Sequence, residues 1–206
     1  MSIIARLVIE WYRSSGSREL PWRKSRDPWH VLLAELLLCR TTTRQVEKIY
    51  EELIARYPSP VELSKASVNE LYNLLKPLGL HSRAKQLVEL AKILVEKYNG
   101  KPPCIKEELI RLPGIGEYSA SLYLLIVCRK ESYPIDSNIA RVLSRIYCVF
   151  EEYELLKSIL KRIAPRNHNE FVELILGLID LGRIVCKPRK PRCGICPLKN
   201  ICMKCT

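Results

Sequence analysis

Four cysteines near the C-terminus are the residues whose spacing indicates chemistry most directly. They follow the pattern Cys186-x6-Cys193-x2-Cys196-x5-Cys202. Thiolates this close in sequence can close a shell around one metal centre, and the Lys and Arg residues between them offset their negative charge. Zinc ribbons usually take ligands from two separated Cys-x2-Cys turns, so a single loop with uneven gaps favours an iron–sulfur cube over zinc. The pattern therefore predicts a [4Fe-4S] cluster.

Two alternatives concern the same cysteines. Cys205 follows shortly after Cys202 and could replace it as the fourth ligand. A disulfide framework is the other alternative, but the sequence shows no secretory leader and the remaining cysteines stand singly in apolar runs. We therefore expect reduced thiols at four positions: Cys39, Cys104, Cys128 and Cys148.

The composition indicates a basic, globular protein. The 206 residues are 48% hydrophobic, which is enough for one large domain or two small lobes. The formal net charge is +12, with Lys and Arg spread along the chain, so we expect a broad positive surface and a nucleic-acid partner. No apolar run approaches the roughly 18 residues of a spanning helix, and we expect no membrane partner.

Hydrophobic periodicity predicts helices almost throughout, and no segment alternates as a strand does. Asp27 before Pro28 is a typical helix start. From Arg83 to Tyr98 apolar side chains recur with a helical period that stops at Asn99-Gly100. Ser67 and Glu70 have the spacing of a capping box. The fold class is therefore all-α, with further helices expected at about 106–112, 117–129, 137–149, 152–163 and 169–184.

A glycine-containing turn lies between two of the expected helices, in the stretch Leu112-Pro113-Gly114-Ile115-Gly116. Glycines let the backbone turn tightly and approach a ligand, and the amides that begin the second helix point outward at its positive end. Such a turn suits a phosphate group. A plain connection between two helices explains the turn equally well when it is taken alone.

Glu35 lies in the apolar stretch 31–38 and has no solvated face in a regular helix. Apolar surroundings favour the neutral carboxyl group, which would equip Glu35 as a general acid. The alternative is a purely structural carboxylate, as we expect for Asp180 within Leu178-Ile179-Asp180-Leu181.

Asp136 and Tyr118 are ambiguous when each is considered alone. Asp136 precedes Ser137-Asn138 at an expected helix start, where an aspartate could simply be an N-cap. Tyr118 could be a core aromatic side chain.

Together these motifs resemble those of the helix-hairpin-helix, iron–sulfur DNA glycosylases of the endonuclease III superfamily. The resemblance implies two helical lobes: a six-helix barrel with the hairpin at 22–132, and a cluster lobe formed by 1–21 plus 133–206. DNA would lie in the cleft between them, with the target nucleotide flipped out of the duplex by a monomeric protein. The matching stretches are Leu20-Pro21-Trp22-Arg23, Ala34-Glu35-Leu36-Leu37-Leu38, Leu78-Gly79-Leu80, Leu112-Pro113-Gly114-Ile115-Gly116, Ile135-Asp136-Ser137-Asn138 and the cysteine loop.

The resemblance also implies roles for individual residues. Asp136 would stabilise the positively charged sugar or activate water, and Asn138 would support it. Glu35 would protonate the leaving base or manage the water, and Tyr118 would face the catalytic aspartate. The DNA-contacting set would be Arg40, which fills the gap left in the duplex, with Leu80, His81, Gly114 and Gly116.

The same comparison predicts the substrate. Tyr118 stands where lyase-type members have lysine, so a monofunctional enzyme is expected. Leu38-Cys39-Arg40-Thr41 and Asp136-Ser137-Asn138 differ from the Leu-Gln-Gln-Thr and Asp-Gly-Asn motifs of adenine glycosylases, and the chain ends soon after the cysteines, without their reader domain. We therefore expect removal of thymine or uracil opposite guanine from double-stranded DNA.

Two other functions remain open from the sequence. One is an adenine glycosylase acting on A·G or A·8-oxoguanine, because some adenine enzymes also have tyrosine at the position of Tyr118. The other is a non-catalytic iron–sulfur DNA-binding module, which would need neither Glu35 nor Asp136. We expect the protein inside an archaeal or bacterial cell, in the cytoplasm with the nucleoid DNA.

Overall fold

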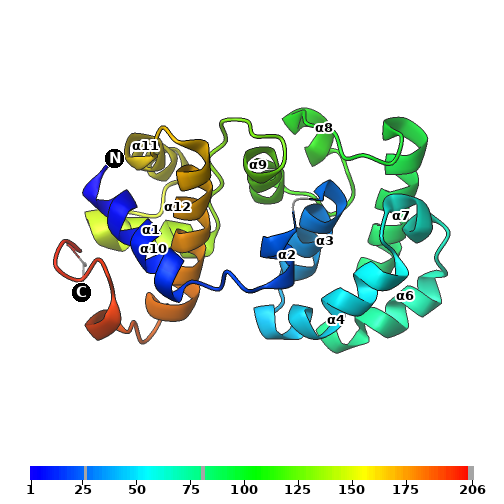
Figure 1. Cartoon of the computed structure of the whole chain (residues 1–206), viewed down its shortest axis with the longest axis horizontal. Helices are drawn as coiled ribbons and strands as arrows, with labels where there is room; N and C mark the ends of the chain where they lie inside the picture. The colour runs from blue at the N-terminus through cyan, green and yellow to red at the C-terminus, as the bar shows by residue number, and fades with distance from the viewer. Residues whose placement is uncertain (26, 80–81, 204–206) are drawn as a thin grey trace. The chain divides into compact units, whose positions relative to one another are not determined.

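The computed structural model describes residues 1–25, 27–79 and 82–203. Within these ranges the regular structure consists of helices joined by short connections, and no strand is present (Figure 1). The expectation of an all-α fold is thus confirmed. In the same ranges, no helix has the length and apolar character needed to cross a membrane.

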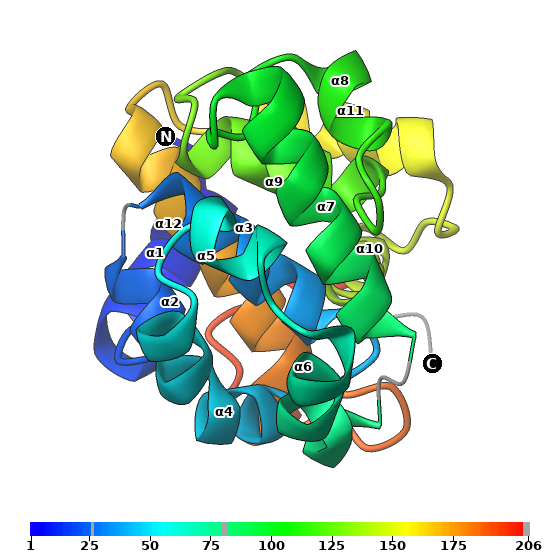
Figure 2. The ribbon, with the colours of Figure 1, turned by 90° about the vertical axis from the view of Figure 1, so that its right-hand side faces the viewer.

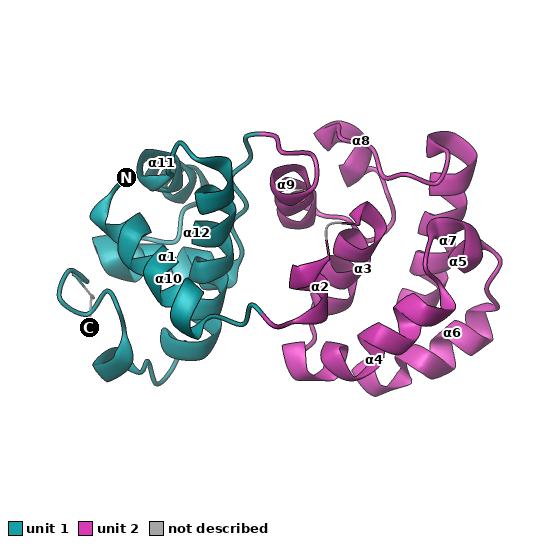
Figure 3. Ribbon diagram, in the orientation of Figure 1, with its two compact units in different colours: residues 1–18, 131–206 teal, residues 19–130 magenta. Residues whose placement is uncertain are grey.

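The chain divides into two compact units, coloured separately in Figure 3. Unit 1 contains Met1–Arg18 and Glu131–Thr206, and unit 2 contains Glu19–Lys130. Unit 1 is therefore discontinuous in sequence, because the N-terminal helix belongs with the C-terminal helices.

Unit 1 is built around α12 (His168–Asp180), which packs against both α1 (Ile3–Ser15) and α10 (Ser137–Tyr147). A fourth helix, α11 (Tyr153–Ile163), packs on α10. Gly177 explains the close approach of α1 to α12, because a Cβ at this position would lie 2.8 Å from Cγ1 of Val8. A π-helical turn at Leu181–Val185 continues α12, and a 3-10 turn at Cys193–Ile195 lies in the cysteine loop.

Asp180 at the end of α12 has the structural role that the sequence indicated. Its carboxylate is completely buried and accepts hydrogen bonds from the amide of Ser17 at 2.8 Å and from Nη2 of Arg183 at 2.9 Å. These bonds hold the segment that follows α1 against the end of α12, and they satisfy a buried charge that would otherwise be costly.

The helices of unit 2 are α2 (Pro21–Lys24), α3 (Pro28–Leu38), α4 (Thr43–Arg56), α5 (Pro60–Ser64), α6 (Val68–Leu75), the 3-10 helix Lys76–Leu78, α7 (Arg83–Tyr98), α8 (Lys106–Ile110) and α9 (Glu117–Ile126). They enclose a leucine-rich core around α3 and α7. Leu32, Leu33 and Leu37 of α3 are fully buried, as are Leu90 and Leu94 of α7. Short helices α5 and α6 pack on α7 (Figure 2), and α3 packs against α2, α4 and α9.

Local signals located several helix ends correctly. Asp27 caps α3 by accepting hydrogen bonds from the amides of Trp29 and His30 at 2.8 and 3.1 Å. Helix α7 ends at Asn99, which adopts a left-handed conformation. Ser67 occupies the N-cap of α6 but makes no side-chain cap bond, so the expected capping box is absent there.

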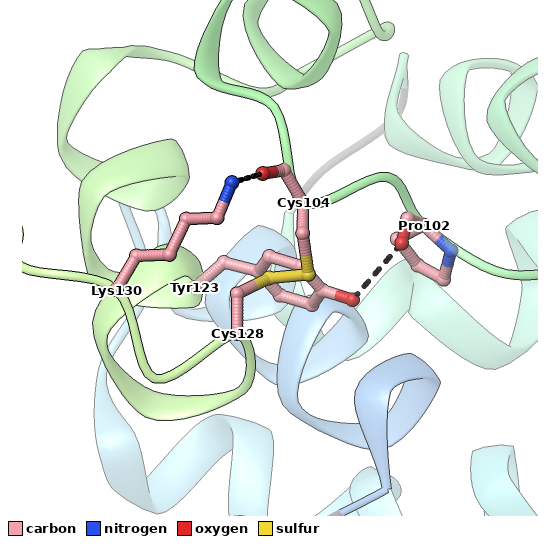
Figure 4. The surroundings of a disulfide bond; sticks show 5 residues. All are labelled: Pro102, Cys104, Tyr123, Cys128 and Lys130. Atoms are coloured by element: carbon pink, nitrogen blue, oxygen red, sulfur yellow. Dashed lines mark hydrogen bonds between the residues drawn. A yellow bond between two sulfur atoms is a disulfide. The ribbon is translucent and has the colours of Figure 1, made fainter.

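A disulfide joins Cys104 to Cys128 in unit 2, which corrects the expectation of reduced thiols (Figure 4). Cys148 is also disulfide-bonded, whereas Cys39 is free. The two halves of the Cys104–Cys128 bond are 24 residues apart, and they meet because α8 and α9 fold back on each other. The sequence around each of these cysteines is apolar and does not indicate that the two side chains pair.

Candidate functional site

The expected glycine-containing turn lies between α8 and α9 in unit 2. Gly114 has a left-handed φ of +81°, and a Cβ there would lie 3.2 Å from Cδ2 of Leu36, so both conformation and packing favour glycine. Leu112 and Ile115 are buried and anchor the turn, while Gly114 and Gly116 are exposed. The turn therefore presents its backbone at the surface.

Gly116 is the N-cap of α9, and it offers no side-chain acceptor to the first amides of the helix. Nothing lies within 4 Å of the position that a Cβ at Gly116 would take. An ion pair of 2.6 Å between Nζ of Lys106 and Oε2 of Glu117 ties the start of α8 to the start of α9. The uncapped amides at this end of α9 are thus available to an anion.

Glu35 and Tyr118 come from two helices that pack together, α3 and α9. Both side chains are half-buried. For Glu35 this differs from the expectation of a fully enclosed carboxyl group, because its neighbours Leu32 and Leu36 are closed off from solvent whereas Glu35 is not. Partial exposure on an otherwise apolar helix lets the carboxyl group reach a ligand.

Arg40 follows α3 and is exposed. Its φ of 63° is left-handed, which is uncommon for a residue with a side chain. The hydroxyl group of Thr41 donates to the carbonyl oxygen of Leu37 and fixes this turn. Leu80 and His81, which the resemblance assigns to the DNA-contacting set, lie outside the described residues.

Asp136 is the N-cap of α10 in unit 1. Its Oδ1 accepts hydrogen bonds from the amides of Asn138 at 3.0 Å and Ile139 at 2.8 Å. Its Oδ2 accepts a 2.7 Å hydrogen bond from the side-chain amide of Asn138. The half-buried carboxylate is therefore held in one orientation by three donors. The cap role and a chemical role are compatible, because capping fixes the direction of the charge.

Arg141 links this carboxylate to the cysteine loop. Its Nη2 donates to Oδ1 of Asn138 at 2.7 Å and to the carbonyl oxygen of Gly182 at 2.9 Å, and its Nε donates to the carbonyl oxygen of Cys186 at 2.8 Å. Hydrogen bonds thus run without a break from Asp136 through Asn138 and Arg141 to the backbone of Cys186. The sequence did not single out Arg141, because its partner at Cys186 depends on the packing of α10 against the end of α12.

Arg145, one turn further along α10, holds the loop that carries the first cysteine. Its Nη1 donates to the carbonyl oxygen of Lys187 at 2.8 Å and lies 3.4 Å from Sγ of Cys186, and its Nη2 donates to the carbonyl oxygen of Pro188 at 2.7 Å. Sγ of Cys202 lies 3.4 Å from the carbonyl oxygen of Arg145. Arg145 therefore holds the segment that begins at Cys186 against α10.

The cysteine loop brings together the four thiols that the sequence selected. Cys186, Cys193, Cys196 and Cys202 are all free and half-buried, and Cys205 lies outside the described residues. Burial raises the pKa of the Cys196 thiol, and the charges of the other three cysteines raise it further. The other three cysteines thus lie near enough to Cys196 to act on its thiol electrostatically.

Four thiolates are a donor set that either a zinc ion or an iron–sulfur cluster can accept. In the part of the chain that the structure describes, no three His, Cys, Asp or Glu side chains lie close enough to share one metal ion. Four thiolates around zinc would each lie about 2.3 Å from the same atom. An iron–sulfur cube instead offers each thiolate a different iron corner, so the donor set fits that cofactor.

Comparison with known proteins agrees with this geometry. Residues 33–166 match the family of HhH-GPD superfamily base excision DNA repair proteins, and residues 186–202 match the iron–sulfur binding domain of endonuclease III. The chain belongs to the HhH-GPD superfamily. The predicted iron–sulfur cofactor and the resemblance to the iron–sulfur DNA glycosylases are confirmed.

Individual relatives cover nearly the whole chain. A thymine-DNA glycosylase of Aeropyrum pernix is 42% identical over 97% of this chain and 93% of its own length. A thymine/uracil-DNA glycosylase of Pyrobaculum aerophilum is 41% identical over 95% of this chain and 89% of its own length. A solved structure of a thermostable thymine-DNA glycosylase has a TM-score of 0.85 at 29% identity, over 97% of this chain and 94% of that one.

Proposed function

We propose that this protein is a monofunctional DNA glycosylase that removes thymine or uracil opposite guanine from double-stranded DNA. The carboxylate of Asp136 carries the proposal, because three hydrogen-bond donors from the first turn of α10 fix its orientation. Relatives named for thymine and uracil, with identities of 42% and 41%, support the choice of base.

Asp136 would act on the sugar of the target nucleotide. As the bond between C1′ and the base breaks, its electron pair leaves with the base and positive charge develops on the sugar. A fixed negative charge near that sugar stabilises the transition state more than the ground state. Water then adds to C1′ and loses a proton, which leaves an abasic site. Since its hydrogen bonds are already formed, Asp136 need not reorganise during this step.

Glu35 would be the general acid or base that transfers a proton during this hydrolysis. A half-buried carboxyl group on α3 can donate to the leaving base or accept from the attacking water. Tyr118, on the helix α9 that packs against α3, would take part without forming a covalent intermediate. Its phenol cannot make the imine that precedes strand cleavage, so the abasic strand remains intact.

DNA would be held mainly through its phosphates. The exposed backbone at Gly114 and Gly116 and the uncapped start of α9 suit a phosphate group, and the net charge of +12 attracts the duplex. Arg40, exposed on its left-handed turn, would enter the gap left by the flipped nucleotide. A mispaired base is already poorly held, so flipping it costs least.

The four cysteines Cys186, Cys193, Cys196 and Cys202 would hold the [4Fe-4S] cluster. When bound, the cluster ties together four points of a loop that has little core of its own. Arg141 and Arg145 would then fix α10 relative to this loop, because both donate to backbone carbonyl groups of the loop. The proposed monomer contains every residue that this scheme uses.

Excision assays on matched duplexes test the proposal. Single-turnover release of base is measured from G·T, G·U, A·G and A·8-oxoguanine duplexes, followed by alkali treatment. We expect thymine and uracil opposite guanine to be released fastest, with strand breaks only after alkali. Faster release of adenine would establish the adenine alternative. Trapping of a protein–DNA adduct by borohydride would contradict the monofunctional assignment.

A further inference from the structure

Arg83 is a buried cation beside the glycine turn of unit 2. It is the first residue of α7, and only 8% of its surface is exposed. No hydrogen bond or ion pair joins its side chain to another residue in the described ranges. The proposed function gives Arg83 no role, and neither the charge pattern nor the resemblance singled it out.

The guanidinium group of Arg83 faces the turn. Its Nη1 lies 3.7 Å from the position that a Cβ at Gly114 would take, and Oε1 of Gln86 lies 3.8 Å from the same point. Arg83 and Gln86 are three residues apart on α7, so they lie on the same face of the helix. Two polar side chains therefore lie beside the exposed backbone of Gly114, two residues before the uncapped N-terminus of α9.

Most of the Arg83 side chain is buried, but its guanidinium nitrogen atoms are not among the fully enclosed unpartnered atoms, so an anion can reach them. Arginine cannot lose its proton in a protein, and burying a charge without a partner is costly. One acidic side chain at the hairpin, Glu117, already pairs with Lys106 at 2.6 Å. An anion that lies at the turn would meet both the guanidinium group and the positive end of α9.

We propose that Arg83 binds a phosphate of the DNA backbone at this turn, together with the first amides of α9. The inference rests on the proposed function only in taking DNA as the ligand. It adds a side-chain contact to a turn whose own contribution is backbone alone. Because Arg83 is already held by the core, little side-chain entropy is lost when the phosphate arrives.

The test is the salt dependence of binding to an undamaged duplex. Each phosphate contact that is lost reduces the slope of log binding constant against log salt by about 0.9. We expect Arg83→Gln to lower that slope by this amount and to weaken binding at low salt by about 10- to 100-fold. Arg83→Lys should retain the slope, because it keeps the charge.

Lys92→Gln is the matched control. Lys92 is exposed and follows Arg83 by two and a half turns of α7, so it lies on the opposite side of the helix. Removing its charge should leave the slope unchanged. Circular dichroism identifies any variant that does not fold, and if Arg83→Gln is unfolded, Arg83→Met, which also removes the charge, replaces it in the test.

Several results would overturn the inference. One is a salt-dependence slope equal to that of the wild type in folded Arg83→Gln, whether or not binding weakens. Another is a slope below that of the wild type in Arg83→Lys. Inorganic phosphate separates the two possible sources of the anion: if it raises the melting temperature of the wild type but not of Arg83→Gln, while the duplex slope is unchanged, the site binds free phosphate instead of DNA. Base release from G·T by the wild type, measured on the same preparation, shows whether the proposed function holds independently.

Discussion

The side-chain amide of Asn138 donates a 2.7 Å hydrogen bond to Oδ2 of Asp136, while the backbone amides of Asn138 and Ile139 occupy Oδ1. Asp136 thus cannot rotate without losing bonds to the helix that it caps. The orientation of the proposed catalytic charge is a property of the first turn of α10. Residues that fix Asn138 should therefore affect catalysis without contacting DNA.

Arg141→Lys tests that dependence. Lysine keeps the charge but cannot reproduce the fork that reaches Asn138, Gly182 and Cys186. We expect single-turnover base release to fall by roughly 10- to 100-fold, with nearly unchanged affinity for undamaged DNA. Arg6→Lys, an exposed substitution on α1, is the control. A wild-type rate in Arg141→Lys would show that the link to the cysteine loop has no bearing on Asp136.

Gly182→Ala should displace Asn138, the residue that orients Asp136. A Cβ at Gly182 would lie 2.6 Å from Cβ and 2.9 Å from Cα of Asn138, and backbone contacts of this kind cannot be relieved by a rotamer change. We expect a loss of about 1–3 kcal/mol of stability in thermal melts, together with slower base release. Gly194→Ala is the matched control, because nothing lies within 4 Å of its Cβ position. Equal melting temperatures for the two variants would contradict this packing.

The cysteine loop predicts a clear pattern of iron loss. Cys196→Ser removes a central thiolate and should abolish iron binding and visible absorbance, whereas Cys39→Ser should retain both. The measurement is iron per protein after purification. If Cys205→Ser loses iron while Cys202→Ser keeps it, Cys205 is the fourth ligand. A colourless wild-type protein with one zinc per chain would contradict the cluster.

The Cys104–Cys128 disulfide should stabilise unit 2, because it closes a loop that contains α8, the glycine turn and α9 (Figure 4). The double variant Cys104→Ser/Cys128→Ser should lose about 2–4 kcal/mol. For a chain of this size that is roughly 4–16 °C in melting temperature. Cys39→Ser, which removes a free thiol, should melt like the wild type. Equal melting of the double variant would mean that the bond contributes no stability.

Features set by neighbouring residues could be predicted from the sequence, and features set by packing could not. Asp27 and the period of 83–98 are local signals, and the structure has α3 and α7 where they indicated. The α-helix expected at 169–184 ends at Asp180. The chain continues as a π-helical turn, in which Gly182 lies against Asn138. Arg141 and Cys186 are 45 residues apart, so no local pattern joins them.

The most direct test is the single-turnover release of thymine from a G·T duplex by the wild type and by Asp136→Asn. Asparagine caps a helix as well as aspartate does, so the variant should fold and bind DNA like the wild type. It lacks the charge, and we expect thymine release by the wild type and almost none by the variant, with equal binding constants. Failure of the wild type to release thymine, or equal release by both proteins, would contradict the proposed function of this site.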